Sequence, residues 1–226
     1  ISVRPSWSRL SSVRIASLGN RWHTAIGRGG DWRNGPRRDY WRRWGTGIHG
    51  RWWPAHRAYA YNWFSRDWWE NHHHGLAGWH YWRAFPRYGF DYWWGVPTWN
   101  NLTTWVTWPT GGIAEPIYYD YGPGGNVVYQ DNNVYVNNEP VATAGEFAES
   151  AADLATVPPP PSDEVAAQSD WKPLGTFALS ANENESDPHR ILQLAINQQG
   201  IISGTLYNTE TDQAKTIEGR VDPQTQ

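Results

Sequence analysis

The sequence predicts a mostly β chain with short helices and a large irregular, disordered N-terminal part. Leu, Ile and Val, the usual core residues, are scarce before residue 100, where Arg, Gly, Asn and Trp dominate. Strand-length apolar runs occur only in the second half. An apolar share of 39% and a mean hydropathy of −0.74 argue against one core running the full length of the 226 residues.

The two halves of the chain carry opposite charge. Residues 1–100 hold fifteen Arg, no Lys and five acidic residues, whereas residues 101–226 hold four basic and seventeen acidic residues. Such halves either attract each other or meet different partners.

The N-terminal half is predicted to contain little regular structure. Residues 1–52 form a disordered Arg/Gly-rich region, because closely spaced Gly and Pro interrupt both helix and strand periodicity. Residues 53–110 form a Trp/Tyr/Arg-rich region with short helices, one expected from Ala55 to Asn71 and one from Thr98 to Val106. The first of these carries an apolar stripe at helical spacing: Ala60, Trp63, Phe64 and Trp68.

Residues 111–157 are predicted to form a small β-meander closed by one helix. Asn and Asp tolerate the positive φ of tight hairpin turns, and Thr143 with Glu146 makes a T-x-x-E capping box for the helix. The strand runs and turns alternate in this order: Val127–Tyr129, Asp131–Asn133, Val134–Val136 and Asn137-Asn138.

The last part of the chain is predicted to be a second β-domain behind a linker. "PPPPS" and the acidic stretch after it make residues 158–170 a semi-stiff, Pro-rich linker. Residues 171–226 hold four strand-length runs, which predict an antiparallel β-domain. Phe177 and Leu179 alternate with period two, so one face is expected to be apolar. Four strands without a helix would leave that face uncovered, which predicts a truncated domain.

Two segments resemble one known family. They are "YYDYGPGGNVVYQDNNVYVNNEPVATAGEFAESAADLA" (118–155) and "WKPLGTFALSANENESDPHRILQLAINQQG" with the residues that follow it to Gln226. They resemble secreted, cell-surface proteins of planctomycetes that are often labelled mu-protocadherin-like. The resemblance implies export to the cell envelope and a β-domain that continues past Gln226. It carries no catalytic motif.

The stretch "DWWENHHHGLAGWHYW" (67–82) raises the question of a metal site. His72, His73 and His74 are the candidate ligands, for adventitious Zn²⁺, Ni²⁺ or Cu²⁺. A catalytic metal is disfavoured because H-E-x-x-H is absent and Gly75 disrupts rigid placement. The sequence favours solvated or stacking histidines.

The Arg- and Trp-rich region is the main functional signal. Guanidinium groups next to aromatic faces suit acidic envelope polymers, single-stranded nucleic acid or a lipid interface. Alternatively, the aromatic side chains pack on one another and on the C-terminal half. The polymer-binding candidates are Trp52, Trp53, Trp63, Trp68, Trp69, Arg42, Arg43 and Arg57.

Several classes of protein are disfavoured. There is no Cys and hence no disulfide or thiolate site, no apolar run of membrane-spanning length, no G-x-S-x-G, and no P-loop Lys in "GRGGDWRNG". We therefore expect a non-enzymatic protein without a cofactor and without a transmembrane segment. The resemblance implies an extracytoplasmic location, and there the Arg/Trp region is expected to bind acidic polysaccharide or another envelope component. A nucleic-acid-binding protein using the same Arg/Trp region is the alternative.

Overall fold

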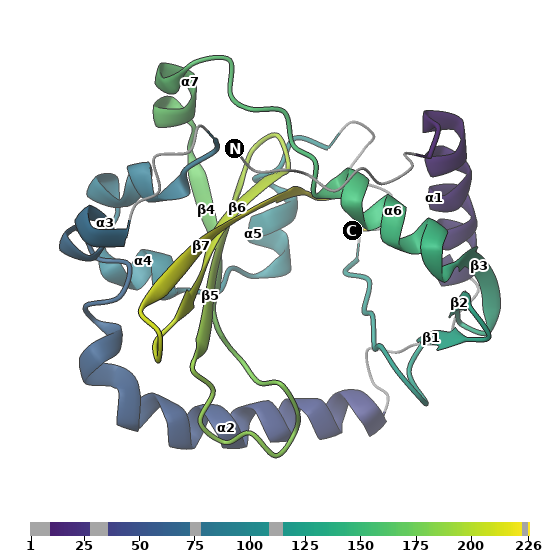
Figure 1. The fold of residues 1–226 in the computed structure, drawn as a ribbon, viewed down its shortest axis with the longest axis horizontal. Coiled ribbons are helices and arrows are strands. Elements are labelled where there is room, and N and C mark those ends of the chain that lie inside the picture. Colours follow the sequence, from purple (N-terminus) through teal and green to yellow (C-terminus); the bar gives the residue numbers. More distant parts are fainter. Residues whose placement is uncertain (1–9, 28–35, 73–77, 109–114, 223–225) are drawn as a thin grey trace. The chain divides into compact units, whose positions relative to one another are not determined.

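The computed structural model describes residues 10–27, 36–72, 78–108, 115–222 and 226 (Figure 1). They form two compact units. The three-strand unit takes its residues from the chain up to Trp41, from Glu115–Thr156 and from the residues after Val221. The four-strand unit takes its residues from Arg42 to Trp108 and from Val157 to Val221. Each unit therefore joins a piece of the N-terminal half to a piece of the second half.

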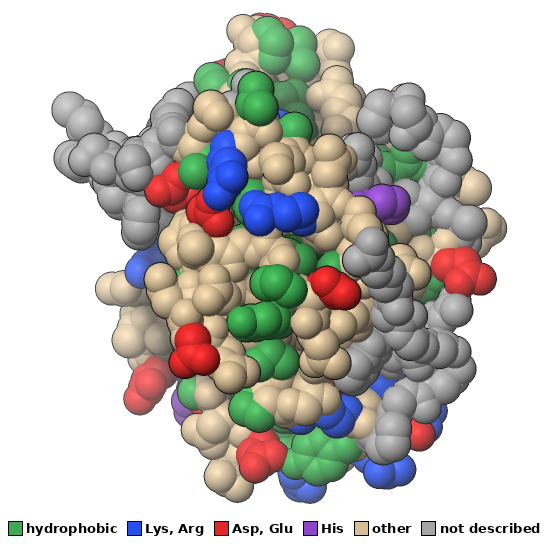
Figure 2. Space-filling view, turned by 90° about the vertical axis from the view of Figure 1, so that its right-hand side faces the viewer, with side chains coloured by type: hydrophobic (Ala, Val, Ile, Leu, Met, Phe, Trp, Pro, Cys, Tyr) green, Lys and Arg blue, Asp and Glu red, His purple; other side chains and the backbone are tan. Residues whose placement is uncertain are grey.

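The three-strand unit is an antiparallel meander with two helices. Its elements are α1 (Ser12–Gly27), the first residues of α2 (Pro36–Ala60), β1 (Val127–Gln130), β2 (Asn133–Val136), β3 (Glu139–Thr143) and α6 (Ala144–Leu154). Leu18 and Trp22 of α1 are buried in one core with Val127, Val134 and Val136 of the strands. Figure 2 views the chain from the side on which Figure 1 draws α1 and α6, and shows a short stripe of hydrophobic side chains there with charged groups beside it.

The local signals of the meander are confirmed. Asp131 and Asn132 have φ of 49° and 61°, and Asn137 and Asn138 have φ of 50° and 66°, so both hairpins turn through left-handed residues. The T-x-x-E box also forms, because the Thr143 side chain accepts from the backbone N–H of residue 146 and the Glu146 carboxylate accepts from the backbone N–H of Thr143. The helix begins where this box places it.

We expect Glu146→Gln to destabilise the three-strand unit at neutral pH and to have little effect in acid. The backbone N–H of Thr143, followed by the Arg14 guanidinium, holds the pKa of Glu146 below its usual 4.5. A carboxyl whose folded-state pKa is lowered stabilises the fold above its unfolded pKa, and this contribution is lost as the pH falls through the folded value. Urea unfolding from pH 7 to pH 2 should show the two proteins converging below about pH 4. Glu149→Gln, on the same helix, controls for the loss of one charge, and a difference that persists to pH 2 would contradict the assignment.

The four-strand unit is a β-meander with short helices. Its further elements are α3 (Arg66–His72), η2 (Tyr81–Arg87), α4 (Phe90–Trp94), α5 (Trp99–Thr103), α7 (Asp163–Gln168), β4 (Trp171–Leu179), β5 (Arg190–Asn197), β6 (Ile201–Asn208) and β7 (Gln213–Arg220). The strands pair antiparallel in the order β4-β5-β6-β7, which confirms the four predicted runs. Figure 1 shows α3 and α4 on one side of this sheet and α5 on the other.

Aromatic side chains from the N-terminal half cover one face of the four-strand sheet. Tyr81 and Trp93 are fully buried, in one core with Ile191, Ala195 and Tyr207 of the strands. This confirms the interpretation, left open by the sequence, that the aromatic residues pack on one another and on the C-terminal half. The sheet face that looked uncovered on the basis of residues 171–226 is covered by residues that precede it by about a hundred positions.

The covered face is not the one that the alternation of large apolar residues predicts. On β5, Ile191, Gln193 and Ala195 are fully buried, whereas Leu192 and Leu194, which point to the other face, are half-buried. Small residues on the covered face leave space for the indole rings. Side-chain size within the strands therefore predicts the wrong face of the sheet as the covered one, because the bulky residues that cover it come from elsewhere in the chain.

A buried polar network fixes η2 on the sheet. The Tyr81 hydroxyl donates to Gln193 Oε1 at 3.0 Å, and Gln193 Nε2 donates to Thr176 Oγ1 at 2.8 Å. Ser203 donates to the carbonyl of Trp79. Burial raises the pKa of Tyr81, so its hydroxyl stays protonated. A buried polar group without a partner destabilises the folded protein. The network therefore favours the position of η2 in which these groups are paired.

Three sequence predictions about regular structure need correction. Residues 12–27 and 36–52 are helical, so the disorder expected over 1–52 does not hold there. The residues that the structure describes are 41% helical and 24% strand, which is mixed rather than mostly β. The helix expected from Ala55 to Asn71 is two helices, because the chain turns between α2 and α3 with Phe64 at φ 58°. The predicted stripe of Ala60, Trp63, Phe64 and Trp68 is nevertheless buried.

The segment predicted as a linker, residues 158–170, packs on the four-strand unit. It contains α7, and Ala166 is 1% exposed. The Trp79 indole N–H donates to the carbonyl of Pro158 at 2.8 Å, and Arg87 donates to the carbonyl of Ala167 at 2.7 Å. Val165 is 41% exposed, so the small Ala166, and not its larger neighbour, anchors the segment.

The opposite charges of the two halves meet inside each unit. Arg side chains from the first hundred residues pair with carboxylates from the rest: Arg14 with Glu146, Arg37 with Asp120, Arg83 with Asp163, and Arg87 with Asp170. Of the two alternatives, mutual attraction is therefore realised. None of the helices that the structure describes is long and apolar enough to cross a bilayer.

Candidate functional site

Six side chains of the four-strand unit form a partly exposed surface, which we call the α2–α4 patch. They are His49, Trp53, Arg57, Tyr61, Phe90 and Trp94. Spacing of four residues aligns the first three along α2 and the last two along α4. Tyr61 lies in the turn that follows α2. Local helix geometry thus produces two short rows of rings.

Ring contacts join the two rows. Trp53 meets Trp94 at 5.4 Å between centroids, and Trp94 stacks on Phe90 at 5.2 Å. Phe90 stacks on Tyr61 at 4.6 Å. Offset and edge arrangements at such distances each add a modest stabilisation beyond burial. The rings therefore support one another while part of each remains at the surface.

Arg57 supplies the charge of the patch. Its guanidinium lies 5.7 Å from the centroid of the Tyr61 ring and donates to the Tyr61 hydroxyl at 3.2 Å. This hydrogen bond raises the pKa of Arg57, so the group is cationic at every physiological pH. Tyr61 is 45% exposed and Arg57 is exposed, so a cation and part of an aromatic side chain are accessible to solvent together.

The structure separates the candidate residues that the sequence grouped. Trp53 and Arg57 come together in the patch, and Arg42 and Arg43 are exposed nearer the start of α2. The other four tryptophans are buried in the core of the four-strand unit: Trp52, Trp63, Trp68 and Trp69. Faces that are covered in the folded state are not available to a polymer.

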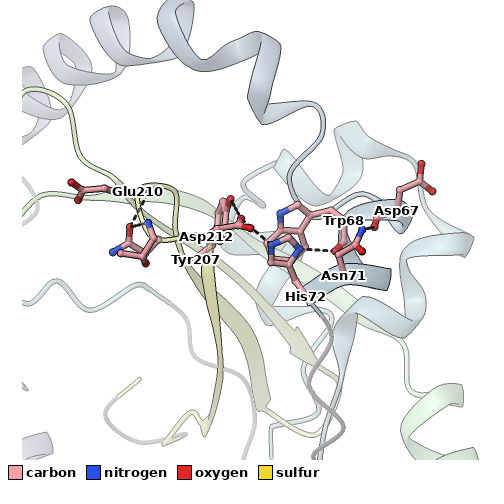
Figure 3. Close-up of polar contacts among 9 residues, drawn as sticks. Asp67, Trp68, Asn71, His72, Tyr207, Glu210 and Asp212 are labelled. Carbon is pink, nitrogen blue, oxygen red and sulfur yellow. Dashed lines mark hydrogen bonds and ion pairs between the residues drawn. The ribbon is translucent and has the colours of Figure 1, made fainter.

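The candidate metal ligand His72 lies in a different arrangement (Figure 3). Its ring stacks on Trp68 at 4.0 Å between centroids. Nδ1 faces the Trp68 carbonyl oxygen at 2.8 Å, and Nε2 faces Asp212 Oδ1 at 3.0 Å. The Tyr207 hydroxyl donates to the same carboxylate oxygen at 2.8 Å. His73 and His74 lie outside the described residues.

This geometry indicates a structural role for His72, which connects α3 to the turn between β6 and β7 through Asp212. Both ring nitrogens of His72 lie within hydrogen-bond distance of oxygen atoms of the protein, so both are engaged in contacts within the fold. Hydrogen bonds from His72 and Tyr207 lower the pKa of Asp212, and burial raises the pKa of Tyr207 to about 12. The carboxylate thus stays charged and the phenol neutral. Within the part of the chain that the structure describes, no three His, Cys, Asp or Glu residues gather as metal ligands.

The same arrangement of a histidine between a tryptophan and an aspartate occurs a second time. His56 stacks on Trp52 at 4.5 Å, its Nδ1 faces the Trp52 carbonyl at 2.9 Å, and its Nε2 lies 3.3 Å from Asp187. Both histidines follow a tryptophan by four residues on a helix, and both reach an Asp in a loop of the sheet. The recurring W-x-x-x-H spacing was available in the sequence and predicts this role better than the run of three histidines.

Four residues of the patch were missed by the sequence analysis: His49, Tyr61, Phe90 and Trp94. The spacing of Phe90 and Trp94 could have indicated a shared helix face. Nothing local, however, indicates that this face meets Trp53.

Comparison with models of protein families, with curated proteins and with solved structures finds no match. The function of the chain is therefore inferred from the geometry of its site.

Proposed function

We propose that the chain is a non-enzymatic, extracytoplasmic protein of the cell envelope that binds acidic polysaccharide through the α2–α4 patch. The observation that carries the proposal is the pairing of Arg57 with the exposed Tyr61 ring, beside Trp53, Phe90 and Trp94. It combines a fixed cation with aromatic surface at one place.

The chemistry of acidic polysaccharide matches this combination. A sugar ring presents C–H groups that stack on an aromatic face, and a uronate adds a carboxylate. A guanidinium can take that carboxylate by a forked pair of charge-assisted hydrogen bonds. Each contact is weak when exposed to water, so useful affinity would come from a polymer that repeats the same group.

The proposed location rests on the family resemblance of residues 118–155 and 171–226, since export is what that resemblance implies. An extracellular polymer is the anionic partner that such a location offers. An anionic partner is also consistent with Arg42 and Arg43, which are exposed on the same helix.

Binding is tested by titrating the chain with polygalacturonate. We expect Arg57→Gln and Tyr61→Ala each to weaken binding about 2–5-fold, because each removes one exposed contact between a cation and an aromatic ring. Affinity should fall as salt rises, because the charges are exposed. Arg51→Gln is the matched control. This substitution removes the same charge from α2 as Arg57→Gln. Arg51, however, lies on the opposite side of the buried residues Ile48 and Trp52 from Arg57.

The ligand class is tested alongside. A neutral polysaccharide of similar length should bind much more weakly, because it offers nothing to Arg57. If single-stranded DNA binds far more tightly than polygalacturonate, with the same dependence on Tyr61 and Arg57, the nucleic-acid alternative replaces this proposal. Equal effects of Arg51→Gln and Arg57→Gln would mean that charge alone acts and that the patch is no site.

A further inference from the structure

A groove between α3 and η2 is the second feature of the four-strand unit suited to a ligand. Its volume is about 760 Å³, within the range of small-molecule sites. It is lined by Arg66, Trp69, Glu70, Trp82, Arg83, Phe85 and Pro86. None of these residues belongs to the α2–α4 patch.

We propose that this groove is a separate subsite that binds a single uronate-type sugar, a pyranose bearing one carboxylate. The choice of ligand class rests on the proposed function. The position, lining and charge of the groove do not depend on it.

The apolar wall of the groove is fixed to the core. Trp69 is buried, and it stacks on Trp82 with 5.5 Å between centroids and 21° between planes. Trp69 also packs against Tyr81, which is held by the buried polar network. A wall anchored in this way needs little ordering on binding, which lowers the entropic cost of holding a small ligand.

The charged side of the groove carries two guanidinium groups against one carboxylate. Arg83 lies 5.7 Å from the Trp82 ring centroid, and its Nη1 reaches the carbonyl of Asp163 at 3.5 Å. Arg66 lies 3.7 Å from Glu70, four residues on along α3, and both side chains are exposed. Each guanidinium lies near a carboxylate of the protein, Arg66 beside Glu70 and Arg83 at 3.9 Å from the exposed Asp163, so a ligand carboxylate would compete with Asp163 for Arg83. The position of Arg83 beside an indole favours a carboxylate attached to an apolar face.

These features discriminate among small ligands. A neutral hexose would contact the rings but offer no carboxylate to compete with Asp163 for Arg83. An inorganic anion would meet the guanidinium but leave the ring surface hydrated. A uronate satisfies both, because its carboxylate and the C–H face of its ring are parts of one rigid molecule.

The test uses the full chain and glucuronate as the probe, with binding followed by saturation-transfer NMR of the sugar protons. We expect Trp82→Ala or Arg83→Gln to weaken glucuronate binding at least about fivefold. Arg87→Gln is the matched control, because Arg87 is on the same helix and also holds the segment around α7, but it does not line the groove. It should bind glucuronate like the unaltered chain.

The two sites can be separated by their variants. Arg57→Gln and Tyr61→Ala should leave glucuronate binding unchanged while weakening polygalacturonate binding. If the unaltered chain fails to bind glucuronate but still binds polygalacturonate through Arg57 and Tyr61, the groove proposal is wrong and the proposed function stands. If glucose binds as well as glucuronate, or if Arg87→Gln weakens binding as much as Arg83→Gln, the groove proposal is also overturned. A third outcome is that glucuronate binding depends on Arg83 while the patch variants do not change polymer binding. The groove proposal would then stand, and the proposed role of the α2–α4 patch would be wrong.

Discussion

Replacing Trp93 with Ala is expected to lower the free energy of unfolding of the four-strand unit by about 3–5 kcal/mol. The ring is 0% exposed and lies between Phe85 at 4.7 Å and Tyr81 at 5.5 Å. Truncation would remove the whole indole from a closely packed layer whose neighbours are themselves rigid rings. Such neighbours cannot collapse into the space, so the cavity persists and adds to the lost burial.

The control for Trp93→Ala is Phe177→Ala, on the other face of the same sheet. Phe177 is 39% exposed, so its removal should cost less than about 1 kcal/mol. Urea unfolding followed by near-ultraviolet circular dichroism measures both. Comparable losses for the two variants would mean that the aromatic layer is not the core of this unit.

Local features of the fold could be predicted from the sequence. The two hairpins rest on Asp131-Asn132 and Asn137-Asn138, and the start of α6 rests on Thr143 and Glu146. In each case the signal and the structure lie within a few residues of each other. Left-handed turns and helix caps have few alternative sequences, so these predictions are specific.

The core could not be predicted, because its two halves are far apart in the chain. Tyr81 meets Gln193 across 112 positions, and no pattern near either residue indicates the other. Leu, Ile and Val are the residues from which a core is usually predicted. This core consists mainly of Trp, Tyr and Phe side chains that pack on the strands. The same bias favoured the wrong sheet face.

Helix α1 and most of helix α2 were missed for a related reason. α2 contains Gly45, Gly47, Gly50 and Pro54, all of which have low intrinsic helix propensity. The Trp52 indole N–H nevertheless donates to the carbonyl of Pro188 at 3.2 Å, and Ile48 and Trp52 are buried against the four-strand unit. Tertiary packing thus overrides propensity, which is itself a small effect per residue.

The candidate site was predicted in composition but not in position. Trp52 and Trp53 are neighbours, yet one is buried and the other lies at the surface, since consecutive helix residues point about 100° apart. A count of Arg and Trp cannot separate them. The two residues are distinguished only by which side of α2 faces the core, and that depends on where the sheet lies.

A fragment of residues 171–226 is expected to lack a cooperative unfolding transition. Its covered sheet face combines the small residues Ala195, Ser203 and Ala214 with Ile191 and Tyr207, and this face packs against rings from the first half of the chain. Without those rings the face is open to water, and four strands then have too little buried surface to fold.

Adding the missing half should restore folding. Co-expression of residues 42–108 with residues 157–221 is expected to give a complex with a single sharp thermal transition, because together they contain Trp79, Tyr81 and Trp93 and the sheet that these rings cover. The control carries Trp93→Ala and Tyr81→Ala in the first piece, which removes two fully buried rings and should abolish the transition. A sharp monomeric melt of residues 171–226 alone would show that the second face, with Leu192 and Leu194, suffices as a core. The aromatic layer would then be an addition to a sheet that folds without it, and the coupling between the two halves of the chain would have to be explained by their charges instead.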